Sequence, residues 1–225
     1  MELLSVVSAR SLWFLDSREM NPRGRQFRPA LINALAERYD FAKAPYDDEA
    51  SPPNTKESPG FKFFDGAFTN YDGIEVMVNL TIFDDGLFGE TRSSTRDSEA
   101  FLDEVVAFAV KEFGLVFKPE MIVKKQFVSE IYVSPAQPLS RLNQKLEKIA
   151  ATLTTALSTP NFPARYEPAG LLFASDPALR ADAGLFRFER KADTPFSLNK
   201  FYSIAPLPTE GHLQVLNELE RILSE

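Results

Sequence analysis

Apolar residues recur along the chain in two different periods, and these periods predict its elements. Where apolar residues alternate with polar ones, or form short runs rich in β-branched residues, we expect strands. These segments are 2–15, 61–68, 74–83, 86–93, 121–133, 169–175, 184–190 and 199–205. Where apolar residues recur every three or four positions, we expect helices. These segments are 29–44, 95–113, 138–157 and 209–223.

Turn residues separate the three consecutive strands between residues 61 and 93. Asn70-Tyr71-Asp72-Gly73 and Asp84-Asp85-Gly86 are hairpin signals, because a glycine after an aspartate tolerates a positive φ angle. Residues 46–60 hold three prolines and one glycine, and no aliphatic side chain beyond one alanine. We expect these residues to form an exposed and mobile loop.

The predicted elements follow the same order twice. Residues 1–114 contain a strand, a helix, three strands and a helix, and residues 115–225 contain the same series. We therefore expect an α+β fold of two similar halves, with a mostly antiparallel sheet and helices that cover one of its faces. No residue-level identity connects the halves, so this predicted duplication is one of elements.

The order of elements resembles two known architectures. Paired modules of this kind are similar to the vicinal-oxygen-chelate proteins, such as glyoxalases and antibiotic-sequestering proteins, whose strands usually carry His and Glu as metal ligands. The halves also resemble the saddle of TATA-binding-protein-like domains, which need a basic concave face to bind DNA. Because this chain has one His and a net charge of −7, neither resemblance brings functional residues with it.

Composition excludes or disfavours several classes of function. The chain has no Cys, which excludes disulfides, thiolate metal sites and a Cys nucleophile. The net charge of −7 favours a protein partner over a nucleic acid, since duplex binding depends largely on Lys and Arg. The first residues lack the basic start of a secretory signal, and no apolar run approaches the roughly 20 residues that cross a bilayer. We expect a cytoplasmic protein that does not enter the membrane.

The most specific enzymatic signal is a Glu-x-Lys pattern on the strand over 184–190. A strand places Glu189 and Lys191 on the same side, and Asp176 or Asp182 upstream could share a magnesium ion with them. This pattern is half of a metal-dependent nuclease signature. The alternative is an ordinary strand whose phenylalanines point inward and whose charged residues point to water, and we favour this alternative.

Other catalytic and cofactor signals are weak. The only histidine, His212, lies near the start of the last predicted helix, where we expect it on the surface. The chain has no Gly-x-Ser-x-Gly sequence and no glycine-rich phosphate loop. We therefore expect no cofactor, no metal ion and no catalytic residue beyond the weak set around Glu189.

The best candidate for a binding site is a basic segment in an otherwise acidic chain. Its arginines precede a predicted helix start, where free N–H groups and guanidinium forks together suit a phosphate or carboxylate. These residues are Arg18, Arg23, Arg25 and Arg28. The alternative, which we favour, is a solvated basic loop balanced by neighbouring acids.

An apolar seam along residues 139–153 could bind a partner or a second copy of the chain, although most such seams face their own core. Together these patterns favour a non-enzymatic binding or protein-interaction factor of the immunity, defence-accessory or assembly type. A homodimer and an anionic ligand at the arginines are left open. The alternative is a metal-dependent nuclease or other phosphate-handling enzyme that uses Glu189 and Lys191. A third hypothesis is a small-ligand pocket lined by Phe between the halves.

Overall fold

The computed structural model describes residues 1–24, 28–45, 60–180 and 184–225. Contacts divide the chain into two compact units. We call Val7–Ser129 with Leu207–Thr209 the N-unit, and Met1–Val6, Glu130–Pro206 and Glu210–Glu225 the C-unit. The predicted boundary between residues 114 and 115 falls inside the N-unit. The predicted loop over 46–60 lies, except for Gly60, outside the described residues.

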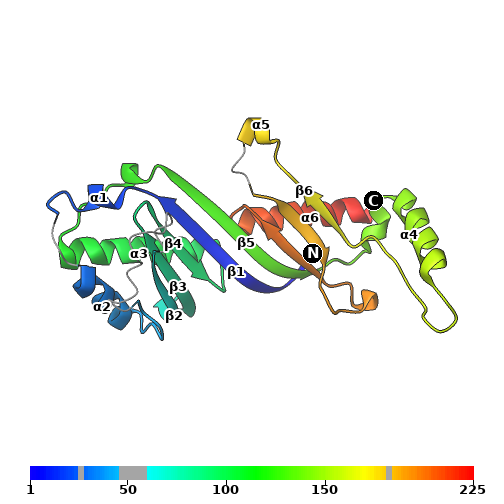
Figure 1. Cartoon of the computed structure of the whole chain (residues 1–225), viewed down its shortest axis with the longest axis horizontal. Coiled ribbons are helices and arrows are strands. Elements are labelled where there is room, and N and C mark those ends of the chain that lie inside the picture. The colour runs from blue at the N-terminus through cyan, green and yellow to red at the C-terminus, as the bar shows by residue number, and fades with distance from the viewer. Residues whose placement is uncertain (25–27, 46–59, 181–183) are drawn as a thin grey trace, which may run out of the picture. The chain divides into compact units, whose positions relative to one another are not determined.

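Eight strands form one sheet with the order β2-β3-β4-β1-β5-β8-β7-β6 (Figure 1). Their bounds are β1 (Glu2–Phe14), β2 (Phe61–Thr69), β3 (Glu75–Phe83), β4 (Gly86–Thr91), β5 (Lys124–Ser134), β6 (Gly170–Phe173), β7 (Phe186–Arg190) and β8 (Phe201–Ala205). The neighbours β2–β3, β3–β4, β4–β1, β6–β7 and β7–β8 pair antiparallel. The predicted α+β fold with an antiparallel sheet is therefore confirmed.

The predicted duplication stays a hypothesis. When β1–β4 are exchanged with β5–β8, the strand order is the same read from the other edge of the sheet, but the two halves share no recognisable residues. Strands β1 and β5 each contribute residues to both units, so neither unit is one continuous stretch of sequence.

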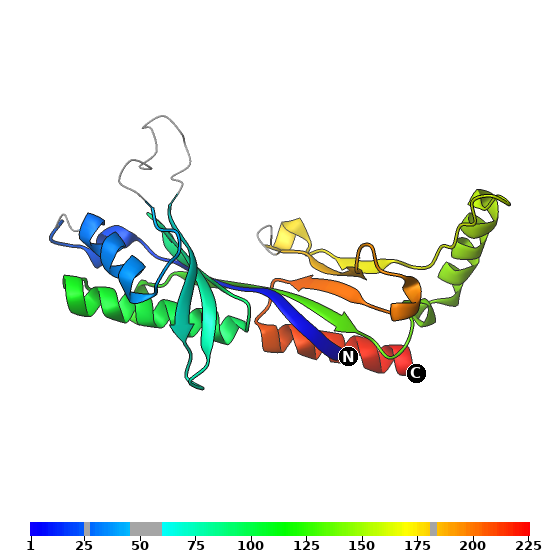
Figure 2. The same cartoon turned by 90° about the horizontal axis from the view of Figure 1, so that it is seen from below.

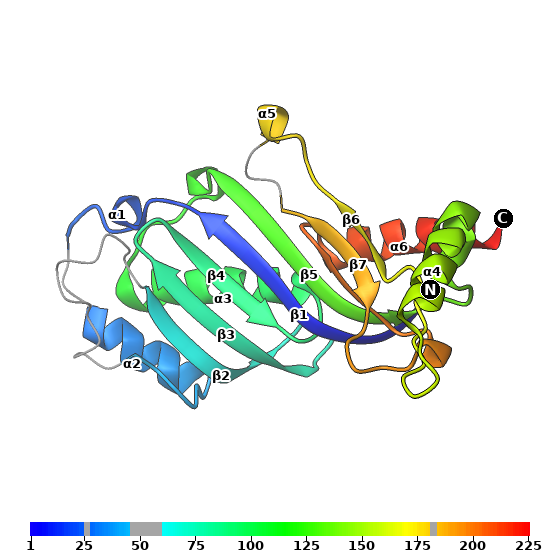
Figure 3. The same ribbon diagram turned by 45° about the vertical axis from the view of Figure 1, so that its right-hand side comes forward.

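The N-unit places its helices against five strands, of which β2, β3, β4 and β1 lie side by side in Figure 3. Its helices are α1 (Ser17–Met20), α2 (Arg28–Arg38), α3 (Thr95–Phe113) and the short 3₁₀ helix η2 (Pro119–Met121). Helix α3 begins where the Ser94 hydroxyl accepts a hydrogen bond from the Asp97 N–H, 3.1 Å away. It ends at Gly114, whose φ of 64° is a conformation that glycine adopts without a steric cost.

The core of the N-unit lies between the sheet and α3. Strand β3 turns Val78 and Leu80 toward the helix, and α3 supplies Phe101 and Leu102. Gly89 allows the close approach of the two layers, because a Cβ atom there would lie 2.9 Å from Cγ of Leu102. Figure 2 shows α3 along one side of the strands of this unit.

The C-unit has a smaller core. Its helices are α4 (Gln144–Leu157), α5 (Pro177–Arg180) and α6 (Thr209–Ser224), with 3₁₀ helices η3 (Leu139–Leu142) and η4 (Phe196–Leu198). Phe188 of β7 and Phe201 of β8 stack with ring centroids 4.4 Å apart and are fully buried. Leu216 of α6 and Ile131 of β5 belong to the same cluster. Within the described ranges, no helix combines the length and the apolar character needed to cross a membrane.

Candidate protein-interaction surface

The helix that the sequence predicts over residues 138–157 is interrupted at Asn143. Asn143 is extended, with φ −158° and ψ 104°, and its side-chain oxygen accepts a hydrogen bond from the Lys145 N–H at 2.9 Å. An asparagine that bonds to the backbone in this way starts a helix rather than continuing one. The prediction of one continuous helix over residues 138–157 is therefore wrong, because the 3₁₀ helix η3 precedes a shorter α4.

The interruption divides the apolar seam into two parts with different environments. Leu139 is buried in the C-unit core and Leu142 packs against that core. The side chains that follow are largely exposed: Leu146 by 39%, Ile149 by 58%, Leu153 by 42% and Leu157 by 52%. The expectation that the seam over residues 139–153 faces its own core is therefore wrong for residues 146–153, and Leu157 extends the exposed part.

The four exposed side chains lie on one face of α4, because they are three or four residues apart. We call Leu146, Ile149, Leu153 and Leu157 the α4 surface. The opposite face of the helix carries the exposed residues Lys148, Ala151 and Thr155. Figures 1 and 2 both show α4 apart from the strands of the C-unit, which explains why this amphipathic helix is not buried there.

Hydrogen bonds hold the segment after α4 in a narrow turn that leaves an aromatic ring in solvent. Thr154 Oγ1 accepts a hydrogen bond from the Tyr166 N–H at 2.9 Å, which ties the returning chain to the helix. Thr159 and Phe162 exchange backbone hydrogen bonds of 3.1 Å in each direction. This narrow turn presents the Phe162 side chain, which is 77% exposed. Exposed apolar groups that gather on one element mark interaction sites more often than isolated ones do.

The residues of the predicted nuclease site have other partners in the structure. Glu189 forms an ion pair with Arg187 at 3.7 Å, and the Lys191 ammonium lies 4.3 Å from the centre of the Tyr132 ring. Asp176 accepts a hydrogen bond from the Ala178 N–H at the start of α5. Asp182 lies outside the described residues. Among the residues that the structure describes, no three His, Cys, Asp or Glu side chains form a group that could hold a metal ion.

Two of the four arginines in the predicted anion site are described in full. Arg18 in α1 and Arg23 after it are both exposed. Arg25 lies outside the described residues, and Arg28 begins α2 with a side chain that also lies outside them. Anion binding by this segment therefore stays a prediction.

His212 is fully buried, at 0% exposure, so its predicted place on the surface is wrong. Its Nε2 atom lies 2.8 Å from Oγ of Ser203, and its ring meets the edge of Phe186 with centroids 5.9 Å apart. The sequence contains a signal for this position: His212 precedes the buried Leu216 by four residues, which places both on the inner face of α6.

Comparison with known proteins does not assign the chain to a family. No protein-family model matches it, and no curated protein has a significantly similar sequence.

Proposed function

We propose that this protein is a non-enzymatic protein-interaction factor that binds its partner through the α4 surface. The observation that supports this proposal is the exposure of four large apolar side chains along one face of a single helix. An amphipathic helix of this kind binds by laying its apolar face into a groove or against another helix. None of the four positions carries a charge that binding would have to desolvate.

The size of the α4 surface sets the strength of binding that it can support. Full burial of a leucine or isoleucine contributes about 1.5–3 kcal/mol, so burial of these four half-exposed side chains contributes roughly 3–6 kcal/mol. Association itself costs at least about 4 kcal/mol. A tight complex therefore needs further contacts, and the exposed ring of Phe162 is the nearest in sequence to supply one.

Partner binding also explains the amphipathic sequence of α4. A helix of 14 residues is marginal in water without tertiary contacts, and nearly every described side chain of α4 is exposed. Burial of the α4 surface against a partner supplies the contacts that the C-unit does not. A second copy of the chain is one such partner, since spacings of three and four residues suit pairing between helices.

Matched substitutions test the proposal. The variant Ile149→Glu/Leu153→Glu places two carboxylates on the α4 surface, and Ala151→Glu/Thr155→Glu places the same charge on the opposite face. Proteins captured from a lysate of the producing cells by the wild type and by each variant are compared by quantitative mass spectrometry after cross-linking. We expect at least one protein to be retained by the opposite-face variant and reduced at least tenfold by the α4-surface variant.

Self-association is measured separately by light scattering across a range of protein concentrations. A dimer that the α4-surface variant abolishes and the opposite-face variant keeps identifies the partner as a second copy. If the wild type and both variants capture the same set of proteins and have the same mass in solution, the α4 surface does not bind a partner and the proposal fails.

A further inference from the structure

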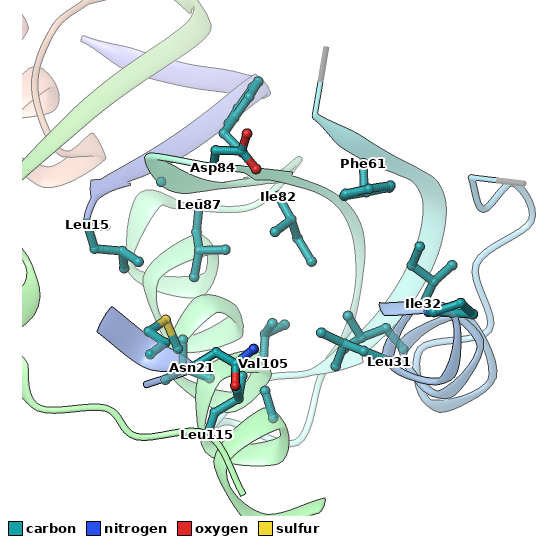
Figure 4. Close-up of a pocket in the computed structure, with 17 residues that line it drawn as sticks. Leu15, Asn21, Leu31, Ile32, Phe61, Ile82, Asp84, Leu87, Val105 and Leu115 are labelled. Atoms are coloured by element: carbon teal, nitrogen blue, oxygen red, sulfur yellow. The ribbon is translucent and has the colours of Figure 1, made fainter. Parts of the chain in front are cut away.

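The N-unit contains a pocket of about 500 Å³, which is independent of the α4 surface. Residues from several elements line it, and Figure 4 shows their side chains turned toward a common space. Helix α2 contributes Leu31 and Leu35, α3 contributes Val105 and Ala109, and the hairpin of β3 and β4 contributes Ile82 and Leu87.

Helices α2 and α3 are joined near the C-terminal end of α2. There Arg38 donates a hydrogen bond to Glu104 at 2.8 Å, and the ring of Tyr39 meets that of Phe101 with centroids 5.1 Å apart. Leu31 and Ile32, which line the pocket, lie in the first half of α2. Close packing of the two helices therefore stops before it reaches Leu31.

The pocket is open to solvent at one side, and most of the side chains that line it are apolar. Among the described residues of the lining, only Asn21 and Asp84 have polar side chains. An ordered water molecule needs two to four polar partners, so this lining suits an apolar occupant better than water.

The lining also restricts the charge of an occupant. Figure 4 shows Asn21 beside Val105 and Leu115, and Asp84 on the opposite side of the pocket. Asp84 is exposed in the turn between β3 and β4, and none of the described residues that line the pocket has a cationic side chain. A carboxylate or phosphate head group in the pocket would therefore be repelled by the Asp84 carboxylate and would have no cationic side chain of the lining to pair with.

We infer that this pocket binds an uncharged small molecule that is mainly hydrocarbon. At about 30 Å³ for a water-sized group, the volume holds roughly 17 such groups, so molecules of about 10–15 non-hydrogen atoms fit. 1-Decanol is a suitable probe, and decanoate differs from it only in the charged head group.

The test measures the affinity of 1-decanol for the full chain by displacement of the neutral fluorophore N-phenyl-1-naphthylamine and by titration calorimetry. Ala109→Phe fills the pocket from α3, and Ala107→Phe makes the same change at an exposed position of that helix. We expect Ala109→Phe to weaken binding at least tenfold and Ala107→Phe to change it less than twofold. The smaller substitution Ala109→Leu, expected to weaken binding at least threefold, serves if Ala109→Phe does not fold.

The measurements distinguish binding of an uncharged ligand in the pocket from binding of a charged ligand and from no binding there. We expect 1-decanol to bind at least tenfold more tightly than decanoate and to raise the melting temperature, since a ligand of the folded state stabilises it. Tighter binding of decanoate would overturn the assignment of an uncharged ligand. Absence of binding, or equal affinity in the wild type and in the pocket-filling and control variants, would overturn the pocket as a ligand site.

Discussion

The buried contact between His212 and Ser203 has one consistent arrangement of protons. The Ser203 hydroxyl lies 2.9 Å from the carbonyl oxygen of Arg187, which can only accept a hydrogen bond. Because a hydroxyl has a single proton, Ser203 donates to Arg187 and accepts from Nε2 of His212. The serine therefore satisfies the polar edge of an imidazole that β7, β8 and α6 hold away from solvent.

Ser203→Ala removes both bonds and leaves a buried N–H without its acceptor. We expect the free energy of unfolding to fall by about 1–3 kcal/mol, which is the cost of an unsatisfied buried donor. Urea titrations followed by far-ultraviolet circular dichroism measure this change. Ser224→Ala, which removes an exposed hydroxyl bonded to Glu220 on α6, is the control and should change stability by less than about 0.5 kcal/mol. Equal effects of the two substitutions would contradict this role.

A second polar cluster stabilises a carboxylate on the N-unit sheet. Burial raises the pKa of Glu90, but hydrogen bonds from Ser8, Asn79 and Arg10 outweigh burial and leave the pKa below its ordinary value of 4.5. Arg10 also forms an ion pair with Glu90 at 3.1 Å. A group whose pKa is lowered by folding stabilises the folded state above its unfolded pKa and loses that effect as pH falls through its folded pKa.

We therefore expect Glu90→Gln to destabilise the N-unit at pH 7, because a neutral amide replaces an acceptor of three hydrogen bonds. The difference from the wild type should shrink as pH falls from the ordinary carboxyl pKa of 4.5 through the lower pKa of Glu90 in the folded protein, because the wild-type carboxyl is then protonated as well. Urea unfolding at pH 7, 5, 4 and 3 measures this, with fluorescence of Trp13, the single tryptophan and a buried residue of the N-unit, as the signal. The exposed Glu75→Gln is the control, and a difference that stays constant with pH would refute the assignment.

Helices α4 and α6 show that an amphipathic pattern alone does not decide burial. Both carry leucine or isoleucine at spacings of three or four residues. Helix α6 lies along the strands of the C-unit and buries Leu216 and Leu223, whereas α4 leaves Leu153 and Leu157 largely exposed (Figure 2). The difference comes from what stands opposite each helix and not from its own sequence.

Leucine truncations at these helices should have unequal effects. We expect Leu216→Ala to cost about 2–5 kcal/mol, as a fully buried leucine does. Leu153→Ala should cost less than about 1 kcal/mol in the monomer, because its side chain is 42% exposed. Thermal and urea unfolding of the two variants provide the comparison. A loss at Leu153 as large as that at Leu216 would show that α4 packs into the core, as the sequence suggested.

At the scale of the whole molecule, the first strand serves two different parts of the chain. Residues Met1–Val6 belong to the C-unit, and Val6 packs against a core formed by residues beyond 130. The rest of β1 belongs to the N-unit, where it pairs with β4 between Ala9↔Thr91 and Phe14↔Gly86. The stability of the C-unit thus depends on residues at the far end of the sequence.

Val6→Ala should loosen the C-unit more than the N-unit. We expect faster amide hydrogen exchange in peptides from β7 and α6, and little change in the urea midpoint reported by Trp13. Glu2→Ala, at an exposed position of the same strand, is the control and should leave both signals unchanged. Faster exchange confined to the N-unit would contradict the division of β1 between the units.

Local patterns were sufficient to predict most of the elements. The hairpin between β3 and β4, and the start and end of α3, depend on groups within a few residues of one another. The Ser94 hydroxyl accepts a hydrogen bond from the Asp97 N–H at the start of α3, and Gly114 adopts the positive φ angle that ends it. Of the candidate sites, the strand period predicted Glu189 and Lys191 on the same side, but β7 ends at Arg190 and Lys191 follows it. The pocket left no comparable signal, because its lining residues are ordinary core residues.

The sequence by itself determined which side chains share a face, because helix and strand periods are properties of the local backbone. It determined the α+β class, the hairpins and the apolar seam for the same reason. Only the tertiary structure decided whether each face meets a neighbour. His212 is buried because β7 and β8 lie over it, the α4 surface is exposed because Asn143 separates α4 from the core seam, and α2 leaves a pocket because it contacts α3 at one end. These outcomes depend on segments far apart in the chain, and no local period carries that information.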